Sequence, residues 1–330
     1  MLNKFKNKKI IITGHTGFKG SWLALWLKLL GAKIIGISLD APTKPSHFIL
    51  LNLRKKIIDI KLDIRNLKKL EKIFKKYQPD FVFHLAAQSL VTRSYKDPIK
   101  TFTTNTVGTM NVLESLIKIN KRFAAIIVTS DKSYKNLEIK RGYHEKDLLG
   151  GSDPYSASKA AAEIIIQSFI NSYFKKNKSQ NIAVARAGNV IGGGDWSDNR
   201  LIPDAIRSIN KNKTIILRNP NFNRPWQHVL EPLYGYLMLA YNLHKSKKTF
   251  SGSWNFGTNK NTITSVEEVI KKIIFFWGSG NYKTTNKKKY YEQENLQLNN
   301  YKAKKILKWK PKTNIDALVK EMIDEDLKNL

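Results

Sequence analysis

The chain has 330 residues, of which 42% are hydrophobic, and this is enough apolar material to bury a large core. An intrinsically disordered protein is therefore excluded. Because the sequence contains no cysteine, disulfides, thiolate nucleophiles and Cys-ligated metal centres are excluded as well, and a cytoplasmic location is expected.

The formal net charge of +32 raises the question of a nucleic-acid partner. Only 10 of the 58 basic residues are Arg, and the lysines are scattered through every predicted helix. Nucleic-acid surfaces favour clustered Arg with interleaved aromatic residues, so we predict a solvated Lys-rich surface and no nucleic-acid partner. The longest apolar runs, Phe123–Val128 and Tyr236–Tyr241, are too short to span a membrane. We expect a soluble, unexported protein without a membrane partner.

Short β-branched runs alternate with amphipathic helical stretches, which is typical of βαβ units around a parallel sheet. Strands are expected at Lys9–Thr13, Lys33–Ser38, Ile57–Lys61, Phe81–Leu85, Ala125–Thr129 and Ile182–Arg186. Helices are expected near Gly17–Leu30, Asn66–Tyr77, Ile99–Lys118 and Tyr155–Phe174. We predict an α/β fold with a Rossmann-type doubly wound parallel sheet of six strands.

The alternation breaks down beyond Asn189. The pattern there predicts a helix near Ile202–Lys211, a strand at Ile215–Leu217, a helix near Leu230–Leu243, and a helix after Ser265 that begins with a Ser265/Glu268 capping box. We expect residues 1–190, rejoined by about 225–258, to form the dinucleotide-binding Rossmann domain. Residues 191–224 and 259–330 are expected to form a smaller, mostly C-terminal α/β domain for the substrate.

The first predicted strand leads into a glycine-rich turn with Gly14, Gly17 and Gly20, followed by an apolar helix. Glycines let the backbone turn sharply and approach a pyrophosphate, while the helix N-terminus points its N–H groups at the anion. Alone, such a turn can be no more than a tight loop. Its position in the first βα turn favours a nucleotide site, although the GxxGxxG spacing differs from the common GxGxxG.

Two acidic residues follow the next two strands. Asp40 lies about 20 residues after Gly20, where a carboxylate can accept from the adenosine ribose and repel a 2′-phosphate, so we predict NAD in preference to NADP. Asp63 is expected either to meet the adenine or to cap the next helix.

Tyr155 and Lys159 stand four residues apart at the start of a predicted helix, on one face. There the Lys159 ammonium can favour the ionised Tyr155 phenol, which makes Tyr155 a candidate general base for a substrate hydroxyl. The preceding strand ends in Thr129-Ser130-Asp131-Lys132. A salt-bridged strand end is the alternative for Asp131 and Lys132, but their place between Ser130 and Tyr155 favours a catalytic site.

With these motifs in this order, the chain resembles the extended short-chain dehydrogenase/reductase family, which acts on nucleotide sugars. The resemblance includes the glycine turn, His84–Ala87, Asn105–Thr109, Ser130, and Tyr155 with Lys159. Within that family, the runs Thr129–Tyr134, Gly150–Tyr155, Ala185–Trp196 and Arg200–Asp204 are similar to the dehydratases that act on CDP-glucose.

The resemblance implies a catalytic set. Ser130 would hydrogen-bond the sugar C4 oxygen, Tyr155 would remove its proton, and Lys159 would hold the nicotinamide ribose and tune Tyr155. Loss of water across C5 and C6 then needs an acid and a base. These would be Asp131 and Lys132, where the dTDP-glucose relatives have Asp and Glu.

The resemblance also implies the two binding sets. NAD would be held by Gly14, His15, Thr16, Gly17, Phe18, Gly20, Asp40, Asp63, Ile64, Leu85, Ala86, Ala87, Asn105, Tyr155 and Lys159. CDP-glucose would be held by Gln88, Asn189, Arg200, Leu201, Arg218, Arg224 and His228. His15 departs from the small residue usual in this turn, and we expect it to loosen NAD binding. No His has metal-ligand spacing, so no metal is assigned.

In this family the helices at Ile99–Lys118 and Tyr155–Phe174 commonly form a four-helix contact, so a homodimer or homotetramer is expected. The activity so implied is NAD-dependent dehydration of CDP-glucose to CDP-4-keto-6-deoxyglucose, in deoxysugar biosynthesis. A dehydratase of dTDP-glucose or GDP-mannose, a nucleotide-sugar 4-epimerase and a non-catalytic dinucleotide-binding regulator are the alternatives.

Overall fold

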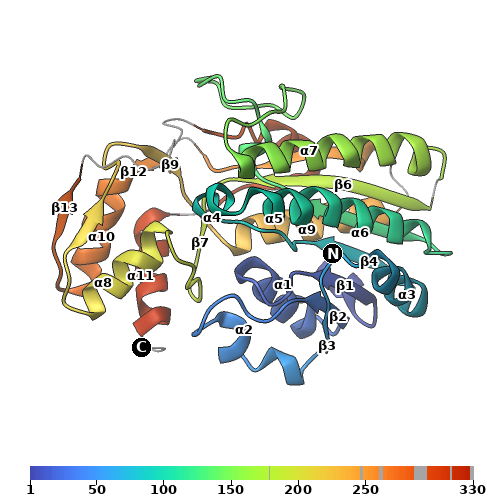
Figure 1. The fold of residues 1–330 in the computed structure, drawn as a ribbon, viewed down its shortest axis with the longest axis horizontal. Coiled ribbons are helices and arrows are strands. Elements are labelled where there is room, and N and C mark those ends of the chain that lie inside the picture. The colour runs from blue at the N-terminus through green and yellow to red at the C-terminus, as the bar shows by residue number, and fades with distance from the viewer. Residues whose placement is uncertain (178, 246–247, 260–262, 286–295, 313, 328–330) are drawn as a thin grey trace.

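The computed structural model describes residues 1–177, 179–245, 248–259, 263–285, 296–312 and 314–327. Parts of the predicted C-terminal segment 259–330 therefore lie outside the described residues. The described chain forms a large sheet with helices on both faces and a smaller layer beside it (Figure 1).

The large sheet is parallel throughout and contains seven strands among the described residues. Its strands are β1 (Lys9–Thr13), β2 (Lys33–Ser38), β3 (Ile58–Lys61), β4 (Phe81–His84), β5 (Phe123–Val128), β6 (Gln180–Ala187) and β11 (Gly252–Phe256). Their order is β11-β6-β5-β4-β1-β2-β3, so the chain reverses its direction across the sheet between β1 and β4. This confirms the predicted doubly wound fold, in which ligands bind at such a reversal point.

The sheet has one more strand than the six predicted. β11 pairs with β6 along its whole length, with Trp254 opposite Ala185. It was missed because the sequence GSWNF is short and alternates polar with aromatic residues. Trp254 and Phe256 face one core, whereas the polar Ser253 and Asn255 face buried hydrogen-bond partners on the other side.

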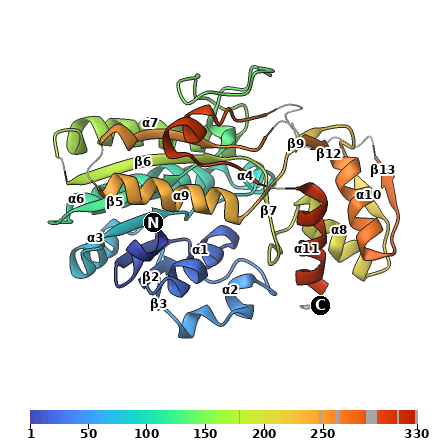
Figure 2. The same cartoon turned by 180° about the vertical axis from the view of Figure 1, so that it is seen from behind.

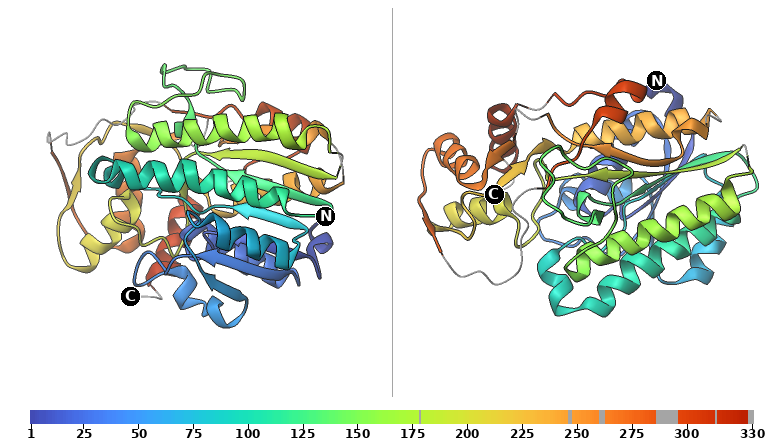
Figure 3. Two further views of the ribbon diagram at one scale, coloured as in Figure 1. Left: turned by 45° about the vertical axis from the view of Figure 1, so that its right-hand side comes forward. Right: turned by 90° about the horizontal axis from the view of Figure 1, so that it is seen from above.

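Helices cover both faces of the sheet (Figures 2 and 3). On one face lie α3 (Leu67–Tyr77), α5 (Pro98–Phe102), α6 (Gly108–Ile117) and α7 (Pro154–Phe169). On the other lie α1 (Phe18–Leu29) and α9 (Leu230–His244). Successive side chains of a strand serve the two cores in turn, so Ile10 and Ile12 pack with α1 and α9 while Ile11 packs with α3 and α6.

The predicted helices Ile99–Lys118 and Tyr155–Phe174 are both present as long helical segments. In the first, α5 and α6 are joined by a π-helical turn at Thr103–Val107; in the second, α7 continues into one at Ile170–Phe174. Two short helices, α2 (His47–Leu50) and α4 (Val91–Lys96), lie in loops at the carboxyl ends of the strands.

The smaller layer has its own apolar core, separate from the two cores of the sheet. Its elements are α8 (Leu201–Asn210), β8 (Ile215–Leu217), β9 (Asn223–Pro225), β12 (Ile263–Ser265), α10 (Val266–Trp277), β13 (Tyr282–Thr284) and α11 (Ile315–Leu327). The predicted capping box at the start of α10 is present, because Ser265 and Glu268 bond each other's backbone N–H. The pair β7 (Val190–Ile191) and β10 (Gln227–His228) lies between this layer and the sheet.

Candidate active site

The glycine-rich turn lies at the carboxyl end of β1 and leads into α1. Gly14 has a φ of +79°, and a Cβ there would lie 2.6 Å from the backbone N of Ala86. At Gly20 a Cβ would lie 2.0 Å from the carbonyl oxygen of Gly14. Only glycine fits at these two positions. Gly17 caps α1, whose first-turn N–H groups can bind an anion.

The loop after β4 lies directly beside this turn. The N–H of Leu85 donates to the carbonyl of Thr13 over 3.0 Å, which fixes Leu85, Ala86 and Ala87 next to Gly14. Asn105, in the π-helical turn, bonds both the N–H and the carbonyl of Gln88 and also the hydroxyl of Ser158, the neighbour of Lys159. Asn105 therefore ties the loop after β4 to α7.

The side chain of Gln88 is held within its own loop. Its Nε2 donates to the carbonyl of Leu90 and, over 3.0 Å, to the hydroxyl of Thr101. Its Oε1 accepts from the N–H of Leu90. The structure brings Gln88 close to Asn105, and the bonds to Leu90 and Thr101 occupy the side-chain amide of Gln88.

His15 and Thr16 point from the turn towards β2 and β3. The buried His15 ring lies against Gly36, and its Nε2 is 2.8 Å from Oδ1 of Asp59. Burial lowers the pKa of His15 despite this carboxylate. The hydroxyl of Thr16 bonds Ser38 over 2.7 Å and the carbonyl of Leu39 over 3.1 Å.

The two acidic residues predicted near the adenosine end both carry cationic partners. Asp40 is exposed after β2 and pairs with Lys61, with Arg54 4.0 Å away, and the Lys61 hydrogen bond lowers its pKa. Asp63 pairs with Arg65.

The alternative that Asp63 caps the following helix is wrong. Asn66 caps α3 by accepting from the N–H of Lys69 over 3.1 Å, because Asn66 is the residue directly before the helix. The adjacent Ile64 is buried, and Asn111 donates to its carbonyl.

Tyr155 and Lys159 lie in the first two turns of α7. Asp153 caps this helix by accepting from the N–H of Ser156 over 3.0 Å, and Pro154 occupies its first position, so Tyr155 is its second residue. Both side chains are buried. Burial raises the pKa of Tyr155 to about 12, although a hydrogen bond with Ser130 acts to lower it. Burial lowers the pKa of Lys159 to about 8.

Ser130 and Asp131 stand where β5 ends, beside Tyr155. Oγ of Ser130 donates to Oδ1 of Asp131 over 2.8 Å, and the N–H of Lys132 donates to the same oxygen over 2.9 Å. Burial raises the pKa of Asp131 above its ordinary value although Lys132 and Lys19 oppose this. A carboxyl with a raised pKa keeps its proton to higher pH than an ordinary carboxyl does, as a general acid requires. Lys132 itself is half-buried.

Lys19 belongs to this site although no sequence argument singled it out. It lies in the glycine turn, between Gly17 and Gly20. Burial lowers its pKa to about 8. The charges of Arg200 and Lys159 also lower its pKa, and those of Asp131 and Asp195 raise it. The available signal was a lysine between Phe18 and Gly20, next to an apolar helix, but only the fold shows that its charge lies near Asp131 after β5 and Lys159 in α7.

The predicted substrate residues fall into two groups. Arg200 is brought to the centre of the site, where it pairs with Asp195 over 2.6 Å and acts on the charge of Lys19 and Tyr155. Asn189 also lies close, because a Cβ on its neighbour Gly188 would be 3.2 Å from Oδ2 of Asp131. Leu201 begins α8 and packs in the smaller layer.

The other group lies on the strands of the smaller layer. Arg224 is in β9, with its guanidinium 5.2 Å from the ring of Phe222, and Arg218 directly follows β8. His228 in β10 lies edge-on to Trp22 of α1, with Nε2 3.9 Å from a Glu321 oxygen, and burial lowers its pKa.

His84 ends β4 with both ring nitrogens bonded, to Thr13 over 2.6 Å and to Thr109 over 2.9 Å. Burial lowers its pKa to about 3, so the ring is neutral. Within the described ranges, no group of three or more His, Cys, Asp or Glu could hold a metal ion. In the same part of the chain, no helix is long and apolar enough to cross a membrane.

Comparison with known proteins identifies the family. Residues 11–322 match the family model described as GDP-mannose 4,6 dehydratase. The chain belongs to this family. It is 44% identical to the CDP-glucose 4,6-dehydratase of Salmonella typhimurium, over 94% of this chain and 88% of that protein. It is 31% identical to a dTDP-D-glucose 4,6-dehydratase of Dictyostelium discoideum, over 81% of this chain and 62% of that protein.

Solved structures agree with the fold. A UDP-glucose 4-epimerase of Thermotoga maritima with UDP-glucose superposes with a TM-score of 0.83 at 22% identity, over 97% of this chain and 99% of that one. A dTDP-glucose 4,6-dehydratase of Streptomyces venezuelae with bound NAD has the same TM-score at 18% identity, over 97% of each chain. The predicted membership of the nucleotide-sugar dehydratases and the predicted fold class are thus confirmed.

Proposed function

We propose that this nucleotide-sugar dehydratase acts on CDP-glucose, which it converts to CDP-4-keto-6-deoxyglucose with NAD as cofactor. The observation that carries the proposal is the junction of β5 and α7, where Ser130 and Tyr155 are bonded and Asp131 lies buried beside them. A 4-epimerase needs the first two residues but has no use for an additional acid. The 44% identity to a CDP-glucose 4,6-dehydratase supports the choice of substrate.

The carboxyl ends of β1, β2 and β4 supply a fitting cradle for NAD. The residues that would hold it are Gly14, His15, Thr16, Gly17, Phe18, Gly20, Asp40, Asp63, Ile64, Leu85, Ala86, Ala87, Asn105, Tyr155 and Lys159. The fit of NAD is supported by Gly14 and Gly20, where no larger residue can be accommodated. They keep the turn free of side chains where a pyrophosphate would approach. When bound, NAD accepts a hydride from C4 of the sugar and later returns it to C6.

Oxidation at C4 needs a base and a hydrogen-bond donor at one oxygen. Tyr155 removes the proton of the C4 hydroxyl while Ser130 holds that oxygen. The Lys159 ammonium, one turn further along α7, favours the ionised phenol and binds the nicotinamide ribose.

Elimination of water follows because the C4 ketone makes the C5 proton acidic. Lys132 removes that proton, and Asp131 gives its own proton to the C6 hydroxyl, which leaves as water. Lys132 returns its proton to C5 when C6 is reduced. The raised pKa of Asp131 supports its role as the acid, because a proton held by the carboxyl is needed at this step.

The sugar nucleotide would lie between the sheet and the smaller layer, held by Gln88, Asn189, Arg200, Leu201, Arg218, Arg224 and His228. Guanidinium groups suit the diphosphate because their fork bonds two oxygens at once. In this arrangement, residues 1–190 with about 225–258 bind the cofactor, and residues 191–224 with 259–330 bind the substrate.

The enzyme would be a cytoplasmic homodimer or homotetramer. Apolar side chains are exposed on the adjoining helices α5, α6 and α7, including Ile99, Phe102, Met110 and Ile164. A four-helix contact between two copies would cover them.

The direct test is to incubate the purified protein with NAD and each of CDP-, dTDP- and UDP-glucose and GDP-mannose. The alkali-induced absorbance of a 4-keto-6-deoxy sugar should rise fastest with CDP-glucose. Faster turnover of dTDP-glucose or GDP-mannose would refute the assignment of CDP-glucose as the substrate. A 4-epimer as product would make the protein an epimerase, and no product with any sugar would leave a dinucleotide-binding regulator.

A further inference from the structure

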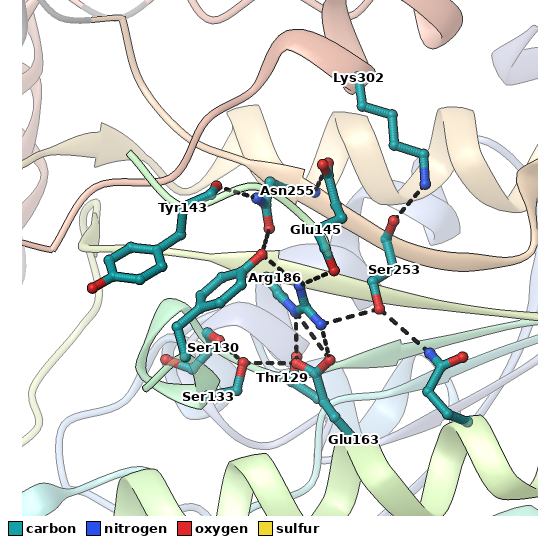
Figure 4. Close-up of polar contacts among 12 residues, drawn as sticks. Thr129, Ser130, Ser133, Tyr143, Glu145, Glu163, Arg186, Ser253, Asn255 and Lys302 are labelled. Atoms are coloured by element: carbon teal, nitrogen blue, oxygen red, sulfur yellow. Dashed lines mark hydrogen bonds and ion pairs between the residues drawn. The ribbon is translucent and has the colours of Figure 1, made fainter. Parts of the chain in front are cut away.

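A buried ion pair lies directly behind the catalytic end of β5 (Figure 4). Glu163 of α7 is 0% exposed, and Arg186 of β6 is 2% exposed. Nε of Arg186 donates to both carboxylate oxygens, over 2.8 and 2.9 Å, and its Nη2 also bonds the carboxylate. Replacing such a pair by apolar residues is often neutral for stability, so stability alone does not explain it.

The carboxylate also holds the catalytic segment by both of its ends. Thr129, just before Ser130, donates to Oε1 of Glu163 over 2.6 Å. The hydroxyl of Ser133, just after Lys132, lies 2.8 Å from the same oxygen and 2.7 Å from the carbonyl oxygen of Ser130, so its one proton can go to either acceptor. The three residues between these hydroxyls are the ones assigned to C4 binding and to elimination. Only an acceptor at residue 163 can receive both hydroxyls.

Arg186 extends this anchorage across the sheet. Its Nη1 donates to the hydroxyl of Tyr134 and, over 3.2 Å, to the carbonyl of Glu145, while Nη2 donates to Ser253 of β11 over 3.1 Å. The guanidinium is also 4.5 Å from the centre of the Tyr134 ring. The carboxylate is therefore fixed from the side opposite the catalytic segment.

Glu163 also stands four residues after Lys159, on the same face of α7. Its negative charge raises the pKa of Lys159, against the lowering by burial. The other titratable groups that face Lys159 are Lys19 from α1 and the neutral His84 from β4, with Tyr155 on its own helix. Among these groups around Lys159, Glu163 supplies the negative charge that favours its ammonium form.

We propose that Glu163 and Arg186 are positioning residues for the dehydration: the carboxylate fixes Ser130, Asp131 and Lys132 through the two flanking hydroxyls and faces the Lys159 ammonium, while Arg186 fixes the carboxylate. This inference rests on the proposed function. It assigns a role to residues that would touch neither the substrate nor the cofactor.

Thr129→Val and Ser133→Ala test the anchorage without disturbing the ion pair. Each should lower kcat about tenfold to a hundredfold, because small misplacements of reacting groups cost rate steeply, while KM for the sugar changes less than twofold. Ser115→Ala is the matched control, since Ser115 is equally buried but donates to Asn111 in α6, away from the site. A kcat for both variants equal to that of Ser115→Ala would overturn the anchorage.

Glu163→Gln tests the charge. Removing the anion lowers the pKa of Lys159. The limb of the pH profile of kcat/KM that reports deprotonation of Lys159 should therefore move to lower pH. Ser133→Ala, which keeps the anion, should leave that limb in place. An unmoved limb would overturn the electrostatic part. If Glu163→Gln does not fold, the two hydroxyl variants still decide the anchorage. Failure of the proposed function is distinguishable, because the unmodified protein would then give no 4-keto-6-deoxy product.

Discussion

Ser130 joins the two halves of the site, because its hydroxyl donates to Oδ1 of Asp131 over 2.8 Å and is also bonded to Tyr155. The bond with Ser130 lowers the pKa of Tyr155, because the Ser130 hydroxyl donates to the ionised phenol. A hydroxyl has a single proton, so Ser130 can donate either to Asp131 or to the ionised Tyr155 at one time. The base proposed for oxidation is thereby connected to the acid proposed for elimination.

Tyr155→Phe should remove most of the activity and leave the fold intact. A positioned general base is worth about 10²–10⁴ in rate, so kcat should fall by that factor. Tyr173→Phe is a matched control, because Tyr173 is 58% exposed near the far end of the same helical segment. Rate measurements beside thermal melts check this; a Tyr155→Phe variant at near-normal speed would refute the assignment.

Lys159→Ala should weaken NAD binding and remove one limb of the pH–rate profile. The ammonium has a pKa of about 8, so activity that depends on it should decline as the pH rises through that value. The variant should lack this decline and be slower below pH 8. The exposed Lys28 of α1, changed to Ala, should alter neither property. Normal NAD affinity together with an unchanged profile would contradict the role.

Asp131→Asn should lose activity but gain stability. Folding raises the pKa of Asp131, so the native state binds this proton at pH values where the unfolded chain has released it. Stability from this group is therefore present at low pH and falls as the pH rises through the native pKa. At pH 7 the variant should therefore have a higher free energy of unfolding than the unmodified protein. Urea unfolding should show this gain disappearing below about pH 4, and a pH-independent difference would count against a raised pKa.

Cofactor choice should depend on the balance of charge around Asp40. We expect NAD to bind more tightly than NADP, because the carboxylate repels a 2′-phosphate. Lys61 and Arg54 partly offset that charge. Asp40→Asn should therefore reduce the preference by about tenfold, and Lys61→Ala should increase it. Titrations with both cofactors measure this, and equal affinities in the unmodified protein would refute the prediction.

The sequence was sufficient for the elements whose local pattern is strong. The strand Lys9–Thr13 and its glycine turn are apolar and regular, so their bounds and their steric need for glycine were predictable. β11 was not, because its Ser253 and Asn255 are polar. They are buried against Arg186 and Tyr134, which come from distant parts of the chain.

The site was predictable where residues are close in sequence and not where the fold assembles them. Tyr155 and Lys159 are one helical turn apart, so spacing alone indicates a shared face. Lys19 is more than a hundred residues from Asp131, and Glu163 is 23 residues from Arg186. These pairings depend on which strands are adjacent in the sheet, and no local pattern encodes that.

The path of one hydrogen atom tests the central claim most directly. The account requires the hydride taken from C4 to return to C6 of the same sugar within one turnover. CDP-glucose labelled with deuterium at C4, incubated with unlabelled NAD, should therefore give CDP-4-keto-6-deoxyglucose with the deuterium at C6, seen by mass spectrometry and NMR, without net release of NADH. Deuterium in solvent or in free NADH, or a product without the label at C6, would contradict the account.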